Sequence, residues 1–164
     1  MKAFFASALA FVMAILSLGA RWADPQGISA VHVSHHALGR TLAEYKVDLT
    51  RMSVWEWKLD DQGAWGRDPE AQFEGFTFAG WLRPGRIRAF RSAAEQYGFA
   101  EWEDRYDIND GVEDGMMFYD GHQWTVTIVF GDGTEKTSYG SNAYPATWGD
   151  MGAALKALTG LDIL

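Results

Sequence analysis

The sequence predicts an α+β domain, in which an antiparallel β-sheet carries two helices packed on one face and is preceded by an N-terminal signal or anchor helix. Several segments alternate apolar and polar residues with period two, as half-solvated strands do. Two later segments, residues 82–99 and 146–160, change to a period of about 3.6. Strands followed by a helix, a hairpin and a second helix indicate a layered α+β arrangement.

The chain has 164 residues, which is enough for one domain, and we assign residues 28–164 to it. The hydrophobic content of 48% and the aromatic content of 15% exclude global disorder. A formal charge of −8 argues against nucleic acid and anionic membrane surfaces as partners, because both attract basic proteins.

Residues 1–20 resemble an export leader. Lys2 is followed by an uncharged run from Ala3 to Ala20, and small residues at Ser17 and Gly19 suit cleavage before Ala20. An uncleaved membrane anchor or a buried helix are the alternatives. Residues 21–27 form a linker. We therefore expect an extracytoplasmic protein (periplasmic, secreted or membrane-tethered) that meets the membrane only through residues 3–20, if these are retained. Because the chain lacks cysteine, disulfides, thiolate metal sites and a lipidated cysteine are excluded.

Strands are predicted by alternation and by turn residues between the alternating runs. The cleanest pairing is the hairpin in which residues 122–130 and 134–139 flank the turn Gly-Asp-Gly. The other expected strands cover residues 28–38, 44–50, 53–61 and 71–78, the last with a bulge near Gly75.

The helix within residues 82–99 is expected to start at Pro84 and to end before Gly98. Its polar side carries Arg86, Arg88 and Arg91, which indicate either a solvated face or an anion site. The second helix within residues 146–160 ends before Gly160.

The acidic segment at residues 107–115 raises the question of a metal. It does not fit an EF-hand, because counting from Asp107 puts glycine at position 5 and Phe118 at position 12. A looser calcium site at Asp107, Asp110 and Asp114 is one interpretation, and a solubilising loop is the other. We expect no cofactor, with calcium at this segment as the alternative.

Histidines and carboxylates are the other candidates for chemistry. Zinc at His32, His35, His36 and His122 requires a bend and further ligands, so structural histidines are the alternative. A hydrolase could use two carboxylates among Glu101, Glu103, Asp110 and Asp120, but the sequence singles out none of them.

Eight tryptophans provide either core volume or exposed indoles that stack on sugar rings or choline-like groups. The regular spacing of Trp55, Trp57 and Trp124 fits burial. Trp65, in a turn-rich segment, is the candidate for ligand binding.

Residues 140–145, Gly-Ser-Asn-Ala-Tyr-Pro, form either a joint or a site. As a joint, Gly140 would supply the dihedral angles that end the strand and Pro145 would begin the last helix. As a site, Asn142 and Tyr144 would bind ligand, and their substitution would cost activity without costing stability.

Between Tyr97 and Gly160, "YGFAEWEDRY", then Asp-Gly before "WTVTIVFGDGTEKTSYGSNAYP", then a short helix, resemble the C-terminal half of an uncharacterised family of small exported bacterial proteins. The resemblance implies an α+β fold and an extracytoplasmic location, with no activity to transfer. Unlike lipoprotein relatives, this chain has no cysteine after the leader.

These observations predict a non-catalytic domain that binds an envelope protein, a polymer or a small ligand. The alternatives are an acidic-loop hydrolase and a calcium-dependent or structural envelope protein.

Overall fold

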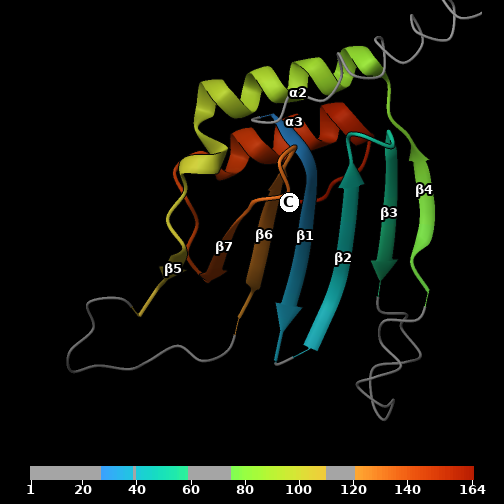
Figure 1. Cartoon of the computed structure of the whole chain (residues 1–164). Coiled ribbons are helices and arrows are strands. Elements are labelled where there is room, and N and C mark those ends of the chain that lie inside the picture. The colour runs from blue at the N-terminus through green and yellow to red at the C-terminus, as the bar shows by residue number, and fades with distance from the viewer. Residues whose placement is uncertain (1–26, 39, 59–74, 110–120) are drawn as a thin grey trace, which may run out of the picture.

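A computed structural model of the chain describes residues 27–38, 40–58, 75–109 and 121–164. They form one seven-stranded sheet and two α-helices, which confirms the α+β prediction (Figure 1). The elements are β1 (Ile28–Ala37), β2 (Arg40–Asp48), β3 (Ser53–Lys58), β4 (Thr77–Trp81), α2 (Pro84–Tyr97), the 3-10 turn η2 (Phe99–Glu101), β5 (Arg105–Asp107), β6 (Gln123–Phe130), β7 (Glu135–Ser141) and α3 (Trp148–Thr159). The expected leader lies outside these residues, and none of the described helices is long and apolar enough to cross a membrane.

The sheet has the order β4-β3-β2-β1-β6-β7-β5, so β1 is central and β4 and β5 are its edges. From β1 to β4 the chain winds outward in antiparallel steps, and the hairpin β6–β7 continues the sheet on the other side of β1. The prediction of a purely antiparallel sheet is wrong at one edge, because β5 pairs parallel with β7. Since α2 joins the end of β4 to the start of β5 at the same end of the sheet, β5 runs opposite to β4 and therefore in the direction of β7.

Helix α2 carries the chain from one edge of the sheet to the other. Six strand spacings of about 4.8 Å amount to about 29 Å. The 14 residues of α2 span about 21 Å, and η2 extends the crossing. As predicted, Pro84 occupies the first turn and Gly98 follows the last. Gly98 has φ 62° and donates its N–H to Ala94 O, as expected of a glycine that ends a helix.

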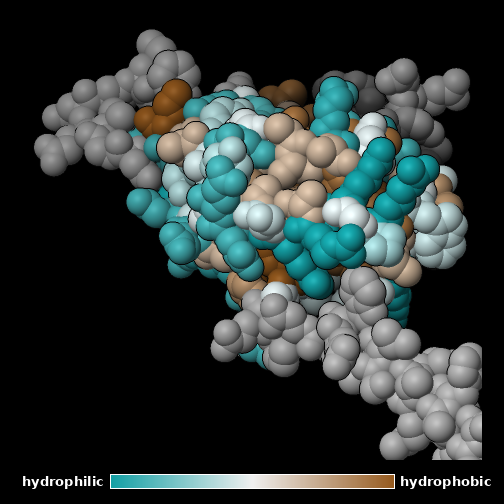
Figure 2. Space-filling model, turned by 90° about the horizontal axis from the view of Figure 1, so that it is seen from above, coloured by the Kyte–Doolittle hydropathy of each residue, from teal (hydrophilic) through white to brown (hydrophobic). Residues whose placement is uncertain are grey.

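The core lies between the helices and one face of the sheet. The helices contribute Ile87, Phe90, Ala94, Met151, Leu155 and Leu158, and the strands contribute Val31, Val33, Tyr45, Val47, Val54, Trp124, Val126 and Ile128. Seen from above, over α2, the molecule is mostly hydrophilic around a smaller pale area (Figure 2). Arg86 and Arg88 of α2 are exposed, in agreement with a solvated helix face.

The opposite face of the sheet is covered by no helix within the described residues. Trp55 and Trp57 share this face, as their alternation predicts, but the expectation that they are buried is wrong. Trp55 is 39% exposed and pairs with Lys46, and Trp57 is half-buried. The core face of β3 is formed instead by Val54 and its alternate neighbour Glu56, because Val54 pairs with the buried Val47.

Candidate functional site

Residues 140–145 begin inside the sheet. Strand β7 continues through Gly140 to Ser141, and Gly140 lies opposite Trp124 on β6. A Cβ atom at Gly140 would lie 2.1 Å from the Trp124 indole. Gly140 does not have a positive φ. It is therefore needed for space beneath the indole, and the expectation that it supplies unusual dihedral angles to end the strand is wrong.

The indole of Trp124 connects the sheet to the following loop. It is completely buried, and its Nε1–H donates a 2.9 Å hydrogen bond to the carbonyl of Ala143. Its ring centroid lies 4.5 Å from that of Trp148 and 6.4 Å from that of Tyr144, whose ring is stacked on it. Pro145 precedes α3 by a turn and is not its first residue, because the helix starts at Trp148.

Asn142 closes this loop onto the start of β6. Its backbone has φ 52°, a left-handed conformation that asparagine tolerates better than most residues. The Asn142 N–H donates to the carbonyl of His122, and the His122 N–H donates to Asn142 Oδ1, both at 3.0 Å. The Asn142 amide group fills the space beside Gly121, where a Cβ atom would lie 2.1 Å from Oδ1. Asn142 is thus built into the structure of the loop.

Tyr144 ends a chain of hydrogen-bonded rings. Its hydroxyl lies 3.0 Å from His122 Nδ1, and His122 Nε2 lies 2.8 Å from His35 Nδ1. His35 Nε2 bonds the carbonyl of Ile163, which can only accept, so this nitrogen carries a hydrogen. His35 Nδ1 then accepts from His122 Nε2–H, and His122 Nδ1 accepts from the Tyr144 hydroxyl. With both imidazoles neutral, every bond in this relay is satisfied.

Burial lowers the pKa of both histidines of the relay and so favours their neutral forms. At His35, the Ile163 carbonyl opposes the effect of burial on the pKa, and the charges of His122 and His36 add to it. At His122, the His36 charge adds to the effect of burial on the pKa. Tyr144 is 44% exposed, so one end of the relay meets the solvent. The arrangement can hold or pass a proton, but we see no nucleophile beside it among the described residues.

The other sequence candidates are not brought to this site. His32 and His36 alternate with His35 on β1, and within the described part of the chain no three metal-ligating side chains gather. Asp107 accepts hydrogen bonds from Asn109 N–H and Arg105, which lower the pKa of its carboxyl. Trp65, Asp110 and Asp114 lie outside the described residues, so their roles stay predictions.

A group of exposed aromatic rings lies at the β4 edge, on the face without helices. Trp55, Phe78 and Trp81 form this aromatic surface and are 39%, 40% and 75% exposed. The ring centroid of Phe78 lies 5.4 Å from that of Trp55 and 4.9 Å from that of Trp81. The ring planes are inclined to that of Phe78 by 71° and 58° respectively. Phe78 and Trp81 are not among the residues that the sequence indicates as a site. Their separation by three residues hid their shared face, which arises from a bulge opposite Val54 and Trp55.

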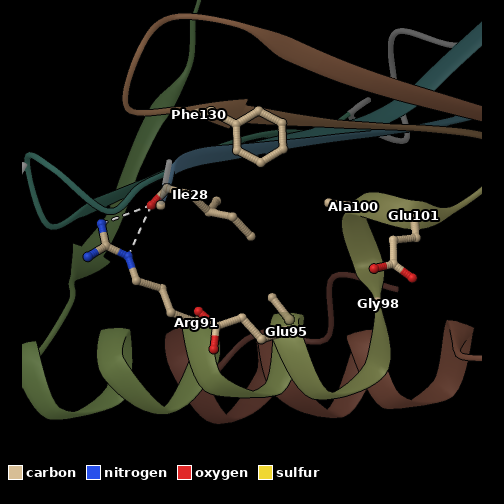
Figure 3. Close-up of a pocket in the computed structure, with 9 residues that line it drawn as sticks. Ile28, Arg91, Glu95, Gly98, Ala100, Glu101 and Phe130 are labelled. Atoms are coloured by element: carbon tan, nitrogen blue, oxygen red, sulfur yellow. Dashed lines mark hydrogen bonds between the residues drawn. The ribbon is translucent and has the colours of Figure 1, made fainter. Parts of the chain in front are cut away.

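A pocket of about 220 Å³ lies between α2 and the ends of β1 and β6 (Figure 3). Arg91 is at one end, where its guanidinium donates two hydrogen bonds to the carbonyl of Ile28. Glu101 is at the other end, beside Gly98, and Glu95 lies nearer to Arg91. The two carboxylates do not converge on one point, and Arg91 has a structural use.

No protein-family model matches this chain, and neither a curated protein nor a solved structure shows significant similarity to it.

Proposed function

We propose that this chain is a non-catalytic binding domain that acts outside the cytoplasm, and that its ligand docks on the aromatic surface. The exposure of Trp81 carries this proposal. Single apolar residues are common on protein surfaces, but adjacent exposed aromatic rings are typical of interaction sites.

The aromatic surface could supply substantial binding free energy. An indole offers up to about 250 Å² for burial, so covering the exposed part of Trp81 would contribute roughly 4 kcal/mol before the cost of association is subtracted. Phe78 lies against Trp81, and Trp55 packs on Phe78.

The hydrolase alternative has less support. A general acid needs a carboxyl with a raised pKa next to a second carboxylate. At Asp107 and Asp132, hydrogen bonds from Asn109 and Thr134 respectively lower the pKa of the carboxyl instead. The pocket of Figure 3 separates Glu95 from Glu101. The proposed location outside the cytoplasm rests on the leader-like sequence of residues 1–20.

The test is a binding experiment on the full chain with Trp81→Ala. Tryptophan fluorescence would be titrated with a set of extended peptides and with soluble cell-wall glycan fragments. We expect at least one probe class to bind, with affinity falling at least tenfold in the variant. Leu38→Ala is the matched control, because Leu38 is 72% exposed but lies in the β1–β2 turn. Equal binding by all three proteins would contradict the proposal.

A further inference from the structure

We infer that the occupant of the aromatic surface is an extended peptide of a partner protein, which adds a strand to β4 and places an acidic residue beside Arg83. This inference rests on the proposed function and specifies its ligand. Strand addition to a sheet edge is a common mode of peptide recognition, in which main-chain hydrogen bonds give affinity and side-chain contacts give specificity.

Among the described residues, the main chain of β4 is paired on one side alone. β4 pairs with β3 along Ser53–Glu56, and within the described ranges no strand lies on its other side (Figure 1). Proteins usually protect such an edge with charged residues or proline. The β4 sequence, Thr-Phe-Ala-Gly-Trp, contains neither. At Gly80 a Cβ atom would meet nothing within 4 Å, so another backbone can approach closely there.

The ring geometry favours a peptide over a sugar. Sugar rings stack on flat aromatic faces, but the planes of Phe78 and its two neighbours are inclined by 58° and 71°. Phe78 contacts both of its neighbours, so the inclined rings present edges as well as faces to an added side chain. An added strand would project every second side chain onto this face of the sheet.

The positive charges near the end of β4 favour a peptide that carries an acidic residue. Arg83 follows Trp81 by two residues, and Arg86 lies in the first turn of α2. This first turn contains no acidic residue. The side chains of Arg83 and Arg86 are exposed, and neither forms an ion pair among the residues that the structure describes. An acidic residue of the peptide would be attracted to these arginines and to the helix N-terminus. A second copy of this chain is disfavoured by its net charge of −8.

The test uses isotope-labelled full-length protein and the capped peptide Asp-Val-Thr-Val-Thr-Val-Asp, whose acidic ends suit either strand direction. We expect amide shifts at β4 and at the Trp81 indole. A fully N-methylated peptide keeps the side chains but loses the main-chain donors, and it should bind at least tenfold more weakly. Replacing both aspartates by lysine should weaken binding at least fivefold at low salt. Because these controls alter only the peptide, protein folding does not affect them.

The outcomes separate this inference from the proposed function. Equal binding of the N-methylated peptide would overturn strand addition, as would shifts confined to other elements. Slow hydrogen exchange at the outer β4 amides of the free protein, or a dimer in sedimentation, would also overturn it, because the edge would then already be covered. If only glycan fragments shift Trp81, strand addition is wrong and the proposed function stands. If no probe affects Trp81, both are wrong.

Discussion

Position 140 has no space for a side chain larger than the hydrogen atom of glycine. The Trp124 indole lies over it and bonds Ala143 beyond it, so a methyl group would force the most buried ring of the molecule to move. Such overpacking typically costs about 1–3 kcal/mol.

We therefore predict that Gly140→Ala lowers the free energy of unfolding by about 2 kcal/mol, measured by urea denaturation. Gly149→Ala is the matched control. Gly149 lies in α3 with no atom within 4 Å of the added Cβ, so this change should raise stability by about 0.5–1 kcal/mol. Equal stability of the two variants would show that the indole does not depend on Gly140.

Asn142 should behave as a structural residue. Asn142→Ala leaves the His122 N–H without its acceptor, and we expect a loss of about 1–3 kcal/mol in the free energy of unfolding. This outcome would favour the interpretation of residues 140–145 as a joint over their interpretation as a site. Thermal melts of the variant give the answer, with Tyr144→Phe as the milder comparison because it removes only the hydroxyl on His122. A variant as stable as the parent would restore the functional interpretation.

The histidine relay predicts a dependence of stability on pH. Burial lowers the pKa of His35 and of His122 below the ordinary 6.5, so the unfolded chain binds protons more readily than the folded one. Neutral His35 and His122 therefore contribute to the free energy of unfolding above pH 6.5. This contribution is lost as the pH falls towards the pKa values of the folded state. Each histidine contributes a slope of at most about 1.4 kcal/mol per pH unit.

This dependence can be measured by urea denaturation at several pH values between 7.5 and 5. In His35→Gln, which cannot be protonated, the slope below pH 6.5 should be shallower than in the parent. His32→Gln is a comparison on the opposite sheet face, where burial also lowers the pKa of His32, so its own smaller contribution is removed while the relay stays intact. An unchanged slope in His35→Gln would contradict the role of the relay.

At the scale of elements, α2 has two sides with different roles. Phe90 is buried against the sheet and packs 6.3 Å from Phe99, whereas Arg88 is exposed. Phe90→Ala should cost about 3–5 kcal/mol of stability, and Arg88→Ala should change it by less than about 0.5 kcal/mol. Denaturation curves of the two variants test this difference. A large loss in Arg88→Ala would show that its side chain makes a structural contact.

The elements differ in how well the local sequence predicts them. The ends of α2, the β6–β7 hairpin and the end of α3 before Gly160 were predicted from local signals, because caps and tight turns depend on neighbouring residues. β5 was not predicted. It has three residues within an acidic stretch, and its strand geometry exists only because β7 lies beside it.

At the scale of the whole molecule, the leader-like segment predicts processing. In a host that exports the protein, we expect mass spectrometry to find a mature chain that begins at Ala20. A mass that includes residues 1–19 in membrane fractions would instead indicate the anchor alternative. The calcium interpretation of the acidic segment can be tested with the same preparation, since calcium that binds only the native state must raise the melting temperature.

The sequence by itself determined properties that depend on neighbouring residues: the class of fold, both ends of α2, the end of α3, the main hairpin and the two faces of β2, β3 and β6. The burial predicted for Trp124 is confirmed, but only the tertiary structure decided which face the helices cover, and hence that Trp55 and Trp81 are exposed. It also joined His35 to His122 across 87 residues and placed β5 parallel to β7. The physical reason is that alternation records two faces without saying which is buried, whereas strand pairing and helix packing depend on contacts between distant segments.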